Sequence, residues 1–288
     1  MNLSKAPYFV AALMIAFVPL ASAQGTYTQI DYPGAVETSC IAINSAGDTV
    51  GFFKDTDSNT HGFLLSSGTF TQLDVPGASS TQAFGINDLG QIVGFNGTGS
   101  FSYDIATQTF SPIVHPGPGT ATVAFGINNR GTIVGYIKNL GSSTEDGFKL
   151  KGTKYTKIDY PKSGVKATYL FNINNSGVII GWVATDNNVK SFSYAQEQFK
   201  IVNIPGASSL LALGINDQKA LVGTYFDGTQ ESGWLYEKGN FQTLNPPGSV
   251  LTYAYSINNS GEVTGYFDDA DSLAHGFTWT PVADAAKK

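Results

Sequence analysis

The stretch Ser80-Thr-Gln-Ala-Phe-Gly-Ile86, continued by Asn87-Asp-Leu-Gly90 and Gln91-Ile-Val-Gly-Phe95, decides the fold of this chain. Two apolar segments flank a turn with Asn first and Gly fourth, the pattern of a short β-hairpin. The part that recurs from end to end is Ile-Asn, a turn and an apolar triplet that ends in glycine. Its copies begin at Ile43, Ile86, Ile127, Ile173, Ile215 and Ile257. A period in the low forties is typical of a β-propeller with one four-stranded blade per repeat.

The first strand of each repeat alternates large with small residues. The large ones are Ile41, Phe84, Phe125, Phe171, Leu213 and Tyr255. A half-exposed strand would alternate apolar with charged residues, so we expect this one to be buried near a crowded axis. Recurrent glycines such as Gly94 in the second strand predict close backbone approach or a bulge. Lys219 replaces the turn glycine in the fifth copy, and a looser turn is expected there.

The two ends of the chain are out of phase with the repeat in a complementary way. Residues 26–32 read as a lone fourth strand, whereas residues 275–280 read as a third strand with no fourth to follow. If the N-terminal strand completes the last blade, the ring closes and no unfinished sheet edge remains. The sequence therefore predicts an all-β, six-bladed β-propeller with four strands per blade, closed by the N-terminal strand.

The first residues have the features of an export signal. Lys5 precedes a short apolar run over residues 8–20, and Ala21-Ser-Ala23 is a small-residue cleavage site. We expect a signal peptide at 1–23, a single propeller at 24–282 and a polar tail at 283–288. The mature protein is expected to be exported, secreted or periplasmic, without membrane insertion.

Composition narrows the possible partners. Only 13% of the residues are charged, and the formal net charge is −6. An acidic chain without a Lys/Arg cluster argues against nucleic acid as a partner. Cys40 is the one cysteine, so no intramolecular disulfide can form, and we interpret it as filler of a small apolar slot. A monomer is expected.

The hairpin phrase followed by His-x-Phe resembles the HAF repeats of bacterial extracellular proteins. The element reads His61-Gly-Phe63 and His275-Gly-Phe277 here, and it decays to Asp146-Gly-Phe148 and Ser232-Gly-Trp234 in other copies. The resemblance covers the whole predicted mature chain and implies an extracellular repeat protein. It implies no catalytic residue, because the motifs of the family are structural.

No catalytic constellation stands out in the sequence. There is no nucleophile elbow, metalloprotease motif, Cys-His cluster or phosphate loop. His61 and His275 occupy the same repeat position, which favours a structural role for both. Asp55-Thr-Asp57-Ser-Asn59 resembles the start of a calcium loop, but Thr60 stands where the required glycine would be. We therefore expect no cofactor, with calcium kept as an alternative.

The loops between the second and third strands are acidic and vary most in length, and variable loops on a rigid scaffold are where binding usually evolves. The candidate ligand-binding residues are Asp55, Asp57, Asp146, Asp227, Asp268, Asp269 and Asp271. The favoured interpretation is a non-catalytic binding module for a carbohydrate, peptide or protein. The alternative is a hydrolase or lyase that uses these carboxylates, with or without calcium, on a polysaccharide or lactone.

Overall fold

The computed structural model describes residues 21–22, 24–186, 188–204 and 209–282, and these form β-strands and no helix. It follows that no helix in this part of the chain could cross a membrane. Most of the predicted signal peptide and the tail at 283–288 lie outside the described residues. Strand β1 (Ala21–Ser22), at the predicted cleavage site, pairs in parallel with the outer strand of the fifth repeat.

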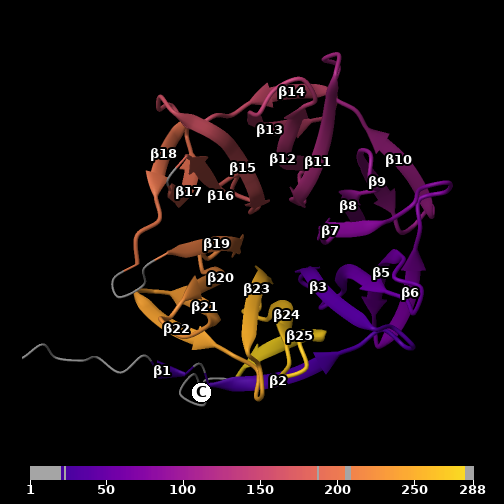
Figure 1. Cartoon of the computed structure of the whole chain (residues 1–288), viewed down its shortest axis with the longest axis vertical. Coiled ribbons are helices and arrows are strands. Elements are labelled where there is room, and N and C mark those ends of the chain that lie inside the picture. The colour runs from indigo at the N-terminus through magenta and orange to yellow at the C-terminus, as the bar shows by residue number, and fades with distance from the viewer. Residues whose placement is uncertain (1–20, 23, 187, 205–208, 283–288) are drawn as a thin grey trace, which may run out of the picture.

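The strands are arranged in a ring around a central axis, and each sequence repeat supplies antiparallel neighbours (Figure 1). The innermost strands are β3 (Glu37–Ile43), β7 (Gln82–Ile86), β11 (Thr120–Ile127), β15 (Val165–Ile173), β19 (Leu210–Ile215) and β23 (Leu251–Ile257). The second strands are β4 (Thr49–Lys54), β8 (Gln91–Phe95), β12 (Thr132–Asn139), β16 (Ile179–Thr185), β20 (Leu221–Phe226) and β24 (Val263–Asp268).

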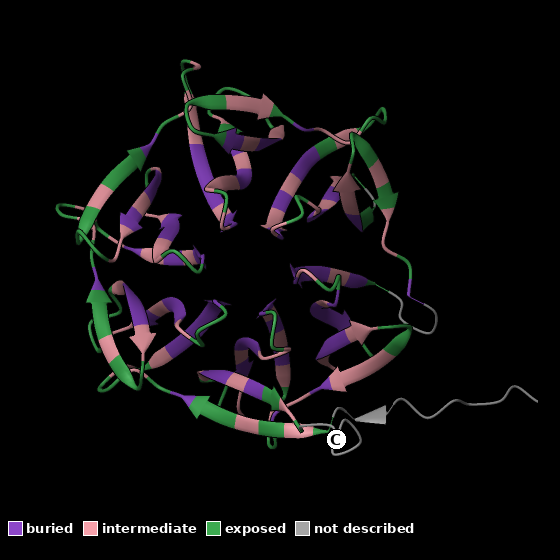
Figure 2. Ribbon diagram, turned by 180° about the vertical axis from the view of Figure 1, so that it is seen from behind, coloured by how far each residue is buried: buried purple, intermediate pink, exposed green. Residues whose placement is uncertain are grey.

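Two further sets of strands follow outward. The third strands are β5 (Thr60–Ser66), β9 (Ser100–Asp104), β13 (Glu145–Lys151), β17 (Asn188–Ala195), β21 (Glu231–Glu237) and β25 (Ala274–Pro281). The outer strands are β6 (Thr69–Leu73), β10 (Thr109–Ile113), β14 (Lys154–Lys157), β18 (Gln198–Ile201), β22 (Asn240–Leu244) and β2 (Gly25–Ile30). The inner strands are mostly buried, and the outer strands are mostly exposed (Figure 2).

The predicted set of six separate four-stranded blades is wrong. The strands described form five hydrogen-bonded sheets, of which three have four strands, one has five and one has eight. The eight-stranded sheet arises because β13 also pairs in parallel with β15 at Glu145 and Ala167. The hairpin of β12 and β13 is long, and it reaches the next inner strand. The five-stranded sheet gains β1 beside β22.

The N-terminal strand joins the sheet of the last repeat. β2 pairs antiparallel with β25 over its whole length, from Gly25 opposite Pro281 to Ile30 opposite Gly276. The segment that follows also contacts the first repeat, where the ring of Tyr32 stacks on Phe53 with centroids 3.7 Å apart. The N-terminal segment thus connects the last sheet to the first.

Each innermost strand contains a bulge at the position of its large residue. The register shifts around Ile41, Phe84, Phe125, Phe171, Leu213 and Tyr255. A glycine of the second strand faces each bulge: a Cβ added to Gly94 would lie 2.0 Å from the carbonyl oxygen of Gln82. The predicted close backbone approach is therefore confirmed, and any side chain there would force the two strands apart.

The core lies between neighbouring sheets. In one interface, Val50, Leu64 and Leu73 of the first repeat pack against Ile92 and Phe101 of the second. Cys40 is fully buried, and its sulfur would clash with any Cβ at position 276. Burial raises the pKa of the Cys40 thiol to about 12. This environment agrees with the interpretation of Cys40 as filler of a small slot.

The turns between the first and second strands form a belt on one rim. The side-chain amides of five turn asparagines donate to the backbone carbonyl of the next turn asparagine, at 3.0–3.1 Å. The last of these links joins Asn258 to Asn44 across the ring. Between the first and second turns, the link is made by Ser45, whose backbone N–H and hydroxyl donate to the Asp88 carboxylate. Lys219 adopts the left-handed conformation of the glycine it replaces, with φ at 64°, and its N–H still donates to the Asn216 carbonyl. The expectation of a looser turn there is wrong.

Candidate functional site

The rim opposite the asparagine belt opens into a cavity of about 500 Å³ at the centre of the ring. Five of the six bulged residues line it: Ile41, Phe84, Phe125, Phe171 and Tyr255. Because a bulged residue has no partner in the ladder, its side chain can point toward the axis. We call this cavity the funnel. The sequence predicted these residues as core, but Phe84, Phe125, Phe171 and Tyr255 are only partly buried.

One side of the funnel is a continuous aromatic surface. The rings of Phe84 and Phe125 stack with centroids 4.9 Å apart, and Phe125 contacts Phe171 at 4.7 Å. The aromatic cluster continues beyond the lining residues, where Phe171 stacks on Trp182 at 5.6 Å and Trp182 lies 4.0 Å from Tyr169. Exposed aromatic faces inside a concave site offer apolar contact area at a low entropic cost.

On its other side, the funnel is lined by Tyr255 and Tyr266, whose rings form a stacked cluster with that of Tyr253. The ring of Tyr266 lies 5.4 Å from that of Tyr253 and 5.9 Å from that of Tyr255. Burial raises the pKa of all three phenols, and the negative charges of Glu231 and Asp268 raise the pKa of Tyr253 and Tyr266 further. These phenols therefore remain protonated and can donate hydrogen bonds at any physiological pH.

Glu37 lines the funnel, and Glu145 and Glu231 lie near aromatic residues of its walls; each of the three has a partner. Glu37 pairs with Lys54 at 2.6 Å. Glu145 accepts a hydrogen bond from the Tyr169 hydroxyl. Glu231 accepts one from the Thr224 hydroxyl at 3.0 Å.

Asp268 differs from these acids. Its carboxylate lines the funnel but makes no hydrogen bond or ion pair within the described part of the chain. Partial burial raises the pKa of Asp268, and the neighbouring charges of Glu37 and Asp269 raise it further. Asp268 is therefore the candidate residue from the sequence that the structure places in a cavity with a free acceptor.

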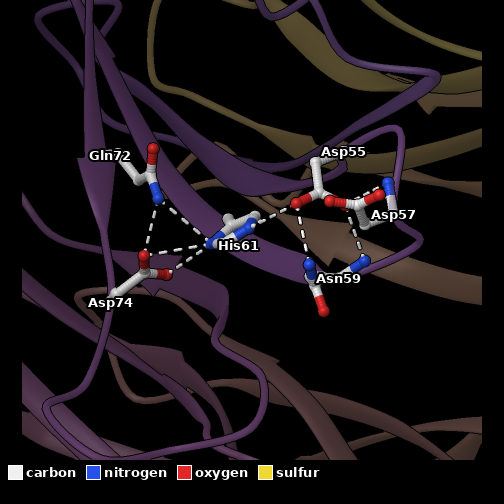
Figure 3. A network of polar contacts seen from close by, with 6 residues as sticks. All are labelled: Asp55, Asp57, Asn59, His61, Gln72 and Asp74. Carbon is white, nitrogen blue, oxygen red and sulfur yellow. Dashed lines mark hydrogen bonds and ion pairs between the residues drawn. The ribbon is translucent and has the colours of Figure 1, made fainter.

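His61 ties a rim loop to an outer strand (Figure 3). Its Nδ1 lies 3.0 Å from the carboxylate of Asp74, and its Nε2 lies 3.3 Å from Asp55 Oδ2. The amide of Gln72 donates to the same Asp74 carboxylate at 2.6 Å. Asp55 also accepts from the Asn59 side chain and from backbone N–H groups, which organises its own loop. We call this arrangement a histidine latch.

The second histidine latch sits where the ring closes. His275 Nδ1 lies 2.8 Å from Asp31 Oδ1, and its Nε2 lies 3.3 Å from Asp269 Oδ2. Gln29 donates to Asp31 at 2.7 Å, as Gln72 does to Asp74 in the first latch. Because Asp31 follows β2 and His275 belongs to β25, this latch fastens the N-terminal strand to the C-terminal one.

Other repeats make the same connection with different side chains. Asp146 replaces the histidine in the third repeat, and Lys157 bridges it to Asp159 at 2.9 Å on each side. In the fifth repeat, Asp227 accepts from the Ser232 hydroxyl at 2.9 Å. Hydrogen bonds to Thr229, Gln230 and Ser232 outweigh desolvation and lower the pKa of Asp227 to about 2.

The seven candidate acids thus divide by environment. Asp55, Asp146, Asp227 and Asp269 form intramolecular connections of the latch type, and Asp268 lines the funnel. Asp57 and Asp271 are exposed at the tips of their loops.

Among the residues described, no group of three or more acids, histidines and cysteines is placed to hold a metal ion. In the loop that resembles the start of a calcium loop, Asp55 Oδ1 accepts backbone N–H groups and forms an Asx turn.

We predict that the two latches stabilise the protein most in mildly acidic solution. Partial burial disfavours protonation of His61 and His275, but the paired aspartates outweigh it and raise each histidine pKa above 6.5. A raised folded-state pKa contributes stability that is complete below the unfolded pKa and is lost as pH rises through the folded pKa. The hydrogen bonds to Asp55 and Asp269 lower the pKa of both carboxyls, so their contribution is lost only as pH falls through that lowered value.

A pH series of thermal melts measures this effect. The melting temperature should fall as pH rises from about 6 to 8, through the range in which histidine titrates. His61→Gln and His275→Gln should each flatten that slope, whereas His115→Gln serves as the control because His115 contacts no carboxylate within the described residues. A slope unchanged in the double variant would contradict the assignment.

The opposite end of the axis holds a much smaller cavity of about 70 Å³. It is lined by the asparagine belt and shares no lining residue with the funnel. Asp88 and Asp217 in its wall each accept hydrogen bonds from both neighbouring turns. Polar contacts between neighbouring turns therefore hold this end of the ring together.

Sequence reasoning missed the funnel. Its aromatic residues were recognised at the correct repeat position, but a large–small alternation does not reveal that a bulge turns the large residue toward the axis. Glu37, Lys54 and Tyr266 were not singled out, since they are unremarkable residues within strands. One signal in the sequence could have pointed to the funnel. Asp268 departs from the repeat, because the equivalent residue of the first repeat is Lys54.

Comparison with solved structures shows the fold of the chain. The luciferin-regenerating enzyme aligns over 90% of this chain and 96% of its own, with 10% identity and a TM-score of 0.54. Oligogalacturonate lyase from Vibrio parahaemolyticus aligns over 93% and 100%, with 12% identity and a TM-score of 0.52. The Aleuria aurantia lectin in complex with Fucα1-6GlcNAc aligns over 88% and 100%, with 13% identity and a TM-score of 0.50.

These similar structures are β-propellers, and identities this low show the fold alone. They include a lectin and enzymes, so the fold by itself does not separate binding from catalysis. No protein-family model and no curated protein sequence matches the chain. The resemblance to HAF repeats therefore stays a prediction.

Proposed function

We propose that this protein is an exported, non-catalytic binding module of the HAF-repeat type that holds a carbohydrate in the funnel. The observation that carries the proposal is the partly exposed aromatic wall of Phe84, Phe125 and Phe171 inside a cavity of about 500 Å³. A sugar ring has an apolar C–H face and a hydroxyl edge. The aromatic wall suits the face, and the edge can be met by phenols and carboxylates at the mouth.

The polar groups around the funnel also favour a sugar over a purely apolar ligand. Protonated tyrosine hydroxyls can donate to a ligand oxygen, and Asp268 can accept from a hydroxyl. The variable acidic loops surround this opening, so differences among them would adjust which saccharide fits.

Titration with a panel of neutral oligosaccharides, followed by calorimetry, tests the proposal. Phe84→Leu should weaken binding about fivefold to tenfold, because an aromatic contact contributes about 1 kcal/mol beyond its area. Phe110→Leu is the matched control, since Phe110 is a half-buried phenylalanine on the outer strand β10. Equal affinity in the wild type and Phe84→Leu would exclude the funnel as the site.

The second candidate function is a hydrolase or lyase with a carboxylate pair in the funnel. The observation that favours it is Asp268, whose pKa is raised by burial and by the charge of Glu37 beside it. A carboxyl with a raised pKa next to another carboxylate is a common arrangement of general acids. Release of reducing ends from a polysaccharide, abolished by Asp268→Asn and by Glu37→Gln, would establish this candidate over simple binding.

A further inference from the structure

We infer that the funnel carries a subsite for an organic ammonium group, formed by Asp268 and the stacked tyrosines Tyr255 and Tyr266. The inference rests on the proposed function insofar as the funnel is a ligand site. It adds that the preferred saccharide or chain end bears a protonated amine. A carboxylate beside aromatic faces is the combination that recognises such cations, through charge and through the ring quadrupole.

The charges in the funnel wall favour a cation. Its charged lining residues are Glu37, Asp268 and Lys54. Lys54 is neutralised by Glu37 at 2.6 Å, and the Asp268 carboxylate has no ion-pair partner within the described residues. The charge of His275 also acts on Asp268, but His275 is itself paired with Asp31 and Asp269. Glu231, on β21 of the preceding repeat, adds negative potential, since its charge acts on the phenols of both Tyr253 and Tyr266. In a concave site, salt screens such charges less than it does on open surface.

The aromatic side of the subsite lies at the same place. Asp268 and Tyr266 belong to β24 and are two residues apart, so their side chains lie on the same face of the strand. Both line the cavity, as does Tyr255, whose ring is 5.9 Å from that of Tyr266. A cation entering the cavity on this side therefore meets a carboxylate and two tyrosine rings together.

Phe52 replaces Tyr266, and Lys54 replaces Asp268, at the equivalent positions of the first repeat. Phe52 makes that part of the wall aromatic as well, but the charge of Lys54 is paired with Glu37. The subsite is therefore specific to the last repeat, which breaks the symmetry of the ring.

The test compares two tetrasaccharides with the same backbone, one of β-1,4-linked glucosamine and one of β-1,4-linked N-acetylglucosamine. In mildly acidic buffer of constant ionic strength, the mature protein should bind the amine-bearing chain about tenfold more tightly. Asp268→Asn should remove this preference. Asp271→Asn, which removes an equal charge from the exposed tip of the adjoining loop, should preserve it.

The aromatic contribution needs its own variants. Tyr266→Phe keeps the ring and should retain the preference, whereas Tyr266→Leu should lose most of it, with thermal melts confirming that each variant is folded. Tetramethylammonium chloride, titrated against sodium chloride at tens of millimolar, probes the cation alone, and its binding should depend on Asp268.

The outcomes separate this inference from the proposed function. Tight binding of neutral saccharides with no gain from the amine would overturn the subsite and leave the binding module in place. A preference that Asp271→Asn reduces as much as Asp268→Asn would show general attraction to the acidic rim, and would also overturn it. Absence of Asp268-dependent binding of tetramethylammonium and of the glucosamine chain would exclude the subsite whatever the neutral panel shows.

Discussion

A chain that begins at Gly34 is expected to lose cooperative folding, because the N-terminal segment completes the ring. Without it, β25 loses its six-residue partner β2 and exposes the edge that carries Phe277 and Trp279. Ile30, which is 8% exposed, would be removed, and burial of such a side chain contributes about 1.5–3 kcal/mol. The stacking of Tyr32 on Phe53 and the Asp31–His275 latch would be lost as well.

The summed loss is comparable to the whole stability of a typical domain, about 5–15 kcal/mol. Urea unfolding followed by circular dichroism should show a cooperative transition for the chain that begins at Gln24. The shorter chain should give a broad transition at lower urea, or should aggregate through the unpaired edge. If both chains share one midpoint and one slope, β2 does not hold the ring closed.

The second large effect concerns the core between sheets. Phe148→Ala should destabilise the protein by about 3–5 kcal/mol, since Phe148 is fully buried between neighbouring sheets and its removal leaves a cavity. Phe125→Ala should cost less, about 1–2 kcal/mol, because Phe125 lines the funnel and only part of its area is buried.

Chemical denaturation of the two variants side by side measures the difference. The sequence predicted Phe125 as a core residue, so this pair distinguishes the core from the funnel wall. Equal costs for Phe125→Ala and Phe148→Ala would mean that the funnel is filled by side chains in solution. Weaker saccharide binding by Phe125→Ala, together with the smaller loss of stability, would support the wall assignment.

The sequence by itself determined the strand order, the hairpins and the phase of the two ends. These are local properties: the Asn-x-x-Gly turn fixes each hairpin, and the large–small alternation fixes the inner strand. The pairing of β2 with β25 could be expected because a missing strand at one end matches an extra strand at the other. The two histidines at one repeat position were likewise expected to be structural, and both form latches.

Tertiary structure alone decided how the strands join into sheets and where a ligand could fit. The pairing of Glu145 with Ala167 merges two repeats into one sheet, and it depends on the reach of a hairpin that repeat counting does not measure. The bulges turn Phe84, Phe125 and Phe171 toward the axis, and a bulge is a matter of register between two strands. Of the acids that the sequence grouped on one rim, four are engaged in connections of the latch type, while Asp268 faces the cavity. Side chains that are alike in sequence thus differ in role, because their hydrogen-bond partners come from other strands.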